Sequence, residues 1–161
     1  MEEDFLSDLG ALALAARMKR ISDLMVHSAR DVYKSLGFDI EPNWYLVLKL
    51  LERRHQLSVT EIASILRFSH SSVVAIVRKM KERGYLECRV DGADGRRQLA
   101  ALSTKAKNEL PRLNDVWAAG ERAIASMIAP HHDILVKLTH IENQLLESDF
   151  KSRTMHEITT D

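Results

Sequence analysis

The pattern of hydrophobic positions between residues 58 and 102 is interrupted once and then changes its period once, and these breaks divide the segment into elements. Apolar residues recur at helical spacing up to residue 66 and again from residue 73 to residue 80, which predicts two short helices. Past Gly84 the pattern alternates, which predicts two strands on either side of the turn-rich residues 91–97. We therefore expect a helix-turn-helix followed directly by a two-stranded β-wing.

Capping residues support these boundaries. Ser58 and Glu61 stand three apart, as in a capping box, and Ser69 is a suitable N-cap for the second helix. Gly84 can adopt the left-handed conformation that ends a helix. The inward face of the second helix is expected to carry Val73, Val74, Ile76, Val77 and Met80. Its outward face carries His70, Ser71, Ser72, Ala75, Arg78, Lys79 and Lys81.

Longer helical patterns flank this segment. They predict helices over residues 3–36, 43–55, 104–127 and 130–150, with residues 151–161 left as a tail. The predicted fold class is mainly α: a winged helix-turn-helix lobe (43–103) within a single domain, 1–161. The apolar faces of residues 1–36 and 104–150 are wider than so small a lobe can cover, so we expect them to dimerise the chain.

Charge is unevenly distributed, although the formal net charge is zero. Residues 58–107 contain ten Lys and Arg against five Asp and Glu, a net charge of +5. Residues 108–161 contain five against nine, a net charge of −4. The positive charge thus coincides with the predicted helix-turn-helix and wing, as expected of a surface that binds phosphates.

The remaining composition limits the setting and the chemistry. One cysteine, Cys88, cannot form an intrachain disulfide, no apolar run approaches the length of a membrane span, and the N-terminus begins with acidic residues. These features predict a cytoplasmic protein without a membrane association. We find no nucleophile with a paired base and no phosphate-binding glycine motif, so neither an enzyme nor a cofactor is expected.

The candidate DNA-binding residues follow from the two predicted elements. Hydroxyl groups at the start of the second helix can reach phosphates or base edges, and Arg96 suits a narrow minor groove, with Asp94 placed to orient it. Arg97 and Lys105 are expected to meet phosphates. The full candidate set is Ser69, His70, Ser71, Ser72, Ala75, Arg78, Lys79, Asp94, Arg96, Arg97 and Lys105.

Five short motifs occur in a characteristic order and spacing: residues 57–63 (LSVTEIA), 71–73 (SSV), 80–86 (MKERGYL), 94–97 (DGRR) and 101–103 (ALS). In these motifs the chain resembles the MarR family of bacterial winged-helix transcriptional regulators, and the resemblance extends over nearly its whole length. It implies a homodimer that binds palindromic double-stranded DNA, with residues 69–83 in the major groove and the wing in the adjacent minor groove. Repression is the more frequent mode in the family. His70 and Ala75 depart from the residues usual in the family, so the operator sequence cannot be transferred.

The resemblance also implies a small anionic or aromatic effector bound beside the DNA-binding lobe. Residues on the helices that border this crevice are the candidates: His27, Arg30, Trp44, Tyr45 and Leu48. Trp44 can equally be a core residue.

Two alternatives stay open from the sequence. His131, His132 and His140 could suggest a metal, but adjacent histidines rarely bind one ion and no further ligand completes a known spacing, so no metal is expected. The lobe could also be a protein-interaction or dimerisation module without a specific operator. Sequence-specific binding to palindromic DNA would separate the two functions.

Overall fold

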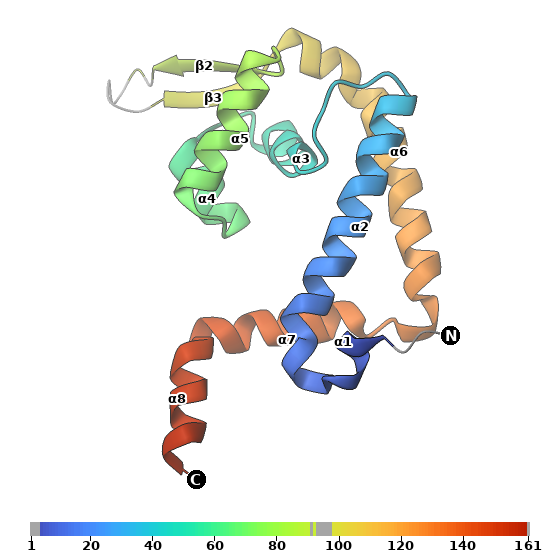
Figure 1. The fold of residues 1–161 in the computed structure, drawn as a ribbon. Coiled ribbons are helices and arrows are strands. Elements are labelled where there is room, and N and C mark those ends of the chain that lie inside the picture. The colour runs from blue at the N-terminus through green and yellow to red at the C-terminus, as the bar shows by residue number, and fades with distance from the viewer. Residues whose placement is uncertain (1–3, 91, 93–97, 161) are drawn as a thin grey trace. The chain divides into compact units, whose positions relative to one another are not determined.

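The computed structural model describes residues 4–90, 92 and 98–160, and its secondary structure is mostly helical (Figure 1). From the N-terminus the elements are α1 (Phe5–Asp8), a 3₁₀ turn (Gly10–Ala13), α2 (Leu14–Ser35), α3 (Trp44–Arg54), β1 (Gln56–Ser58), α4 (Val59–Leu66), α5 (His70–Glu82) and β2 (Leu86–Val90). They continue with β3 (Gln98–Leu102), α6 (Thr104–Ile128), a second 3₁₀ turn (Ala129–His131), α7 (Ile134–Glu147) and α8 (Phe150–Thr160). The mainly α fold class and the winged helix-turn-helix are confirmed.

The chain forms two compact units, residues 1–110 and residues 111–161. The first unit contains every element from α1 to β3 and the start of α6. The second contains the rest of α6 together with α7 and α8. Across residues 4–90, 92 and 98–160, none of the helices combines the length and the apolarity that crossing a bilayer requires.

The sheet has three antiparallel strands in the order β1-β3-β2, rather than the two that we predicted. The hairpin of β2 and β3 forms as expected, with Cys88 opposite Ala100. The additional strand β1 pairs with the other edge of β3, so that Leu57 also lies opposite Ala100. At three residues β1 is too short to show an alternating pattern, and only its pairing with a distant strand identifies it.

The helix-turn-helix begins as its capping residues predict. Glu61 accepts a hydrogen bond from the Ser58 backbone N–H (2.8 Å), while Ser58 Oγ accepts one from the Glu61 N–H (3.3 Å). This capping box satisfies two amides that the first turn of α4 leaves unpaired. Arg67, in the left-handed region (φ 54°), ends α4, and Gly84 (φ 76°) follows the end of α5 as expected.

The long N-terminal helix predicted over residues 3–36 is interrupted, and this prediction was wrong in its first third. Gly10 adopts a positive φ of 55°, which ends α1 and starts the 3₁₀ turn before α2. The Arg20 guanidinium then donates two hydrogen bonds to Asp4, at 2.7 and 3.0 Å. This ion pair lowers the pKa of Asp4 well below its usual range and holds the N-terminal turn against α2.

At the other end, residues 150–160 form α8 where we expected a tail. Asp149 caps this helix by accepting a hydrogen bond from the Ser152 N–H (2.7 Å). Arg153 then reaches back across the break and donates to the carbonyl oxygens of Ser148 (2.9 Å) and Gln144 (2.6 Å). The carbonyls at the end of α7 are thereby satisfied by a side chain of the following helix.

The core of the first unit lies where α3, α4, α5 and the sheet meet. Its largest fully buried side chains are Trp44, Tyr85, Leu48, Leu51, Ile62, Met80, Val47 and Val73. The predicted inward face of α5 is confirmed except at Val74, which is 42% exposed. The Trp44 and Tyr85 rings meet edge to face, with centroids 5.6 Å apart. This aromatic pair joins α3 to the start of the wing.

Tyr85 provides a test of this core at alkaline pH. Burial and a 2.6 Å hydrogen bond from its hydroxyl to Glu109 raise the Tyr85 pKa well above its usual value near 10. A raised pKa means that the neutral phenol stabilises the fold below pH 10, and this contribution is lost as the pH rises above 10. We expect Tyr85→Phe to lower the free energy of unfolding by about 1–2 kcal/mol at neutral pH. Urea unfolding should show a smaller alkaline loss for the variant than for the unmodified chain; parallel losses would contradict this assignment.

Candidate nucleic-acid interface and the pocket beside it

A cluster of serines forms the N-terminus of α5. Ser69 Oγ caps the helix by accepting a hydrogen bond from the Ser72 N–H (3.2 Å), as predicted from the sequence. The same oxygen lies 2.7 Å from Ser72 Oγ and 3.2 Å from Ser71 Oγ. The three hydroxyl groups are exposed to solvent at the positive end of the helix dipole. Such an arrangement favours the approach of an anionic group such as a phosphate.

The outward face of α5 is exposed along its whole length. His70, Ser71, Ser72, Ala75, Arg78, Lys79 and Lys81 are all exposed. Arg78 makes one loose ion pair with Glu82 (3.8 Å) at the far end of the helix, where both side chains are about two-thirds exposed. An ion pair of this kind contributes little, so the Arg78 guanidinium is free to exchange Glu82 for a phosphate at small cost.

The wing contributes strands β2 and β3, but its tip is not described. The candidates Asp94, Arg96 and Arg97 lie outside the described residues, and their roles stay predictions. Lys105, after β3, lies with its ammonium 4.2 Å from the centre of the Tyr85 ring and 3.0 Å from the Arg83 carbonyl oxygen. These two internal contacts therefore compete with the binding of a phosphate by Lys105.

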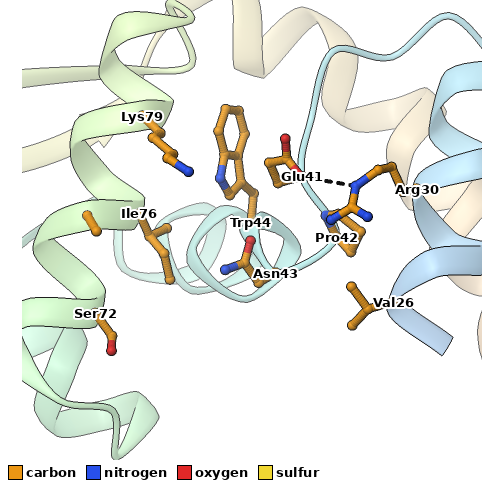
Figure 2. A pocket seen from close by; sticks show the side chains of 10 residues that line it. Val26, Arg30, Glu41, Pro42, Asn43, Trp44, Ser72, Ile76 and Lys79 are labelled. Carbon is orange, nitrogen blue, oxygen red and sulfur yellow. Dashed lines mark hydrogen bonds and ion pairs between the residues drawn. The ribbon is translucent and has the colours of Figure 1, made fainter. Parts of the chain in front are cut away.

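A pocket of about 720 Å³ lies beside α5, between that helix, α3 and α2 (Figure 2). Its lining comes from α2 (Val26, Arg30), the loop into α3 (Glu41, Pro42, Asn43), α3 itself (Trp44) and α5 (Ser72, Ala75, Ile76, Lys79). Two cations and one carboxylate line this space, and Glu41 pairs with Arg30 at 3.4 Å. An anionic group would therefore find a net positive wall.

Two of the five predicted effector residues, Arg30 and Trp44, line this pocket. Leu48 is fully buried in the core, and Trp44 is both core and pocket wall, with 1% of its surface exposed. His27 and Tyr45 are exposed and lie outside the lining. Each directly follows a lining residue, Val26 or Trp44, and adjacent side chains on a helix point about 100° apart around its axis.

Sequence reasoning missed the contribution of the loop before α3 and the double role of Lys79. Glu41 and Pro42 fell between the predicted helices 3–36 and 43–55, and Asn43 fell at the start of the second. None of the three was given a role, because a loop shows no periodic pattern that places its side chains. Lys79 was assigned to DNA, yet Figure 2 shows its side chain directed toward Trp44 at the pocket. Within the part of the chain that the structure describes, no three His, Cys, Asp or Glu side chains group as metal ligands.

The sequence model of the MarR family matches residues 38–97, which include α3, α4, α5 and β2. This segment belongs to the MarR family. The resemblance seen in the sequence is thereby confirmed for the DNA-binding lobe. No curated protein matches the sequence.

Solved structures with the same fold extend beyond the MarR segment. A MarR/EmrR family transcriptional regulator from Acinetobacter sp. ADP1 has a TM-score of 0.70 at 18% identity, over 83% of this chain and 94% of that chain. MepR of S. aureus, solved with DNA, has a TM-score of 0.67 at 19% identity, over 83% and 96%. PcaV of Streptomyces coelicolor, solved with its natural ligand, has a TM-score of 0.65 at 20% identity, over 92% of this chain and 99% of that chain. At these identities the likeness establishes the fold.

Proposed function

We propose that this protein is a sequence-specific regulator of transcription that binds double-stranded DNA, most simply as a repressor in the cytoplasm. The observation that carries the proposal is the exposed face of α5, where three hydroxyl groups at the helix N-terminus precede Arg78 and Lys79 on one surface. α5 is the second helix of a helix-turn-helix, the one that enters the major groove in proteins of this architecture. MepR, a structural relative, was solved bound to DNA.

A homodimer is part of the proposal. Several apolar side chains of α2 and of the second unit are exposed in the single chain, among them Leu24 (64%), Val136 (70%) and Leu146 (65%). A single chain that exposes apolar faces of this kind generally covers them with a partner, and a two-fold dimer would present two copies of α5 to a palindromic site.

Regulation by a small anionic or aromatic effector completes the proposal. The pocket between α2, α3 and α5 combines the Trp44 ring with the cations of Arg30 and Lys79, and it touches the recognition helix directly. A ligand with different affinity for two positions of α5 would shift the DNA affinity. A screen of phenolic carboxylates that leaves DNA binding unchanged would remove this part of the proposal.

The function is tested by titrating the purified protein into the intergenic DNA upstream of its own gene at fixed salt. A shuffled duplex of equal length is the competitor, because phosphate contacts alone give non-specific affinity. A preference of about a thousandfold supports a sequence-specific regulator. Equal affinity for both duplexes, with no site recovered by selection from random DNA, would favour the alternative, a protein-interaction module without an operator.

Arg96 is the wing residue that we expect to enter the minor groove. Arg96→Ala should weaken operator binding by roughly 1–3 kcal/mol, because a narrow minor groove concentrates negative potential around a guanidinium. Titrations at several salt concentrations measure both the affinity and its salt dependence, with Arg89→Ala, on β2, as the matched loss of an exposed arginine. An unchanged affinity together with an unchanged salt slope would remove Arg96 from the interface.

A further inference from the structure

Glu41 lies between two arginines that come from different helices. One carboxylate oxygen, Oε2, is 3.4 Å from Arg30 Nε on α2, and the other, Oε1, is 3.5 Å from Arg83 Nη2 at the end of α5. The carboxylate itself is on the loop that leads into α3. A single side chain thus connects the N-terminal helix with the last turn of the recognition helix. Figure 2 shows the Arg30 side of this connection at the edge of the pocket.

Arg83 links the Glu41 carboxylate to α5. It is the C-cap residue of the helix, and its backbone N–H donates to the Lys79 carbonyl at 3.1 Å. Its guanidinium also donates to Asp39 at 2.7 Å and lies 5.4 Å from the centre of the Trp44 ring. These contacts fix the orientation of the Arg83 side chain, so a displacement of Glu41 would also displace the end of the recognition helix.

We propose that Glu41 is a positioning residue that sets the placement of α5 against α2 through Arg30 and Arg83. Each ion pair is half-exposed and weak by itself, since Arg30 and Arg83 keep 52% and 39% of their side-chain surface. The contribution comes from sharing one carboxylate between two elements, which couples their positions. Glu41 acts through the arginines and is not itself a DNA contact. This inference concerns the DNA affinity of α5 and so rests on the proposed function.

Asp39 provides the matched control. It pairs with the same Arg83 at the shorter distance of 2.7 Å, whereas the additional pair with Arg30 on α2 belongs to Glu41. If the two carboxylates only anchored Arg83 locally, Asp39→Asn would have the larger effect. If Glu41 connects α2 with α5, Glu41→Gln weakens operator binding by about three- to tenfold, while Asp39→Asn changes it less than about twofold.

Further readouts separate positioning from a general loss of stability. Glu41→Gln is expected to leave the affinity for shuffled DNA and the salt slope unchanged, because it removes no phosphate contact. Arg30→Gln should reproduce its effect, and the double variant Arg30→Gln, Glu41→Gln should be no weaker than either single variant. Equal losses from Glu41→Gln and Asp39→Asn that follow the melting temperature, or additive losses in the double variant, would overturn the proposal.

Hydrogen exchange tests the same connection without DNA, so it decides the question even if the chain shows no operator preference. Glu41→Gln should speed amide exchange by about three- to tenfold in the last turn of α5 and in residues 26–34 of α2. Asp39→Asn should affect the α5 end alone. Exchange that is unchanged in α2 in both variants would show that Glu41 does not connect the helices.

Discussion

Replacing Ser71 with glutamate is expected to weaken operator binding by roughly 100-fold or more without unfolding the protein. Ser71 is exposed in the first turn of α5, beside the Ser69 cap, where a carboxylate interacts favourably with the helix dipole. On bound DNA the same carboxylate would face phosphates or acceptor groups of the bases. The free energy of unfolding should therefore be unchanged or slightly higher while binding is lost. Urea unfolding and operator titration of the same preparation measure both quantities.

Ser71→Gln is the control for this change, because glutamine has the same size as glutamate but no charge. We expect the glutamine variant to lose at most about tenfold, since it replaces one short polar contact. Full operator binding by Ser71→Glu would contradict the placement of α5 on DNA. Equal loss in both variants would contradict repulsion between the carboxylate and the phosphates, because it would indicate a steric effect.

The parts of this fold that were predicted correctly are those that local rules specify. The capping box of Ser58 and Glu61, the Ser69 cap and the left-handed Gly84 each act within a few residues. Because these signals agree with the apolar period of α4 and α5, the helix-turn-helix could be located to within about one residue of its observed bounds. The structure of such a segment can be predicted from its sequence because the local signals agree with the global fold.

The parts that were missed depend on partners distant in the sequence. The interruption at Gly10 accompanies the Asp4–Arg20 pair across sixteen positions, and an isolated glycine in a helical pattern is often tolerated. Strand β1 exists because β3 offers it an unpaired edge. Helix α8 was taken for a tail because its apolar spacing is weak, although the Asp149–Ser152 cap was present in the sequence. No local pattern alone decides between these outcomes.

The candidate site likewise has one part that the sequence predicts and another part that depends on packing between distant residues. The exposed face of α5 follows directly from a helical period, and every predicted member of it is exposed. The pocket instead collects residues from α2, a loop, α3 and α5, so its lining depends on how these elements pack. Sequence reasoning could name Arg30 and Trp44 because they lie on the bordering helices. It could not find Glu41, whose importance depends on two arginines 11 residues before it and 42 after it.

Trp44 is the position at which core and pocket meet, and its removal is expected to have the largest effect on stability. The side chain is 1% exposed, meets Tyr85 edge to face and lies beneath the Arg83 guanidinium. Trp44→Ala should therefore lower the free energy of unfolding by about 3–5 kcal/mol, the usual cost of removing a buried aromatic side chain. Urea unfolding followed by circular dichroism measures the loss without relying on the deleted fluorophore.

Tyr45→Ala is the matched control, since Tyr45 is the next residue on α3 and 43% of its surface is exposed. We expect Tyr45→Ala to lower the free energy of unfolding by about 1 kcal/mol or less. Equal losses at the two positions would show that Trp44 is not the centre of this core. A large loss at Trp44 has a consequence for the effector: because the pocket wall is also core, alanine at this position destabilises the fold and alters the pocket at the same time. Ligand binding is therefore better tested at Lys79, which lines the same pocket from the exposed face of α5.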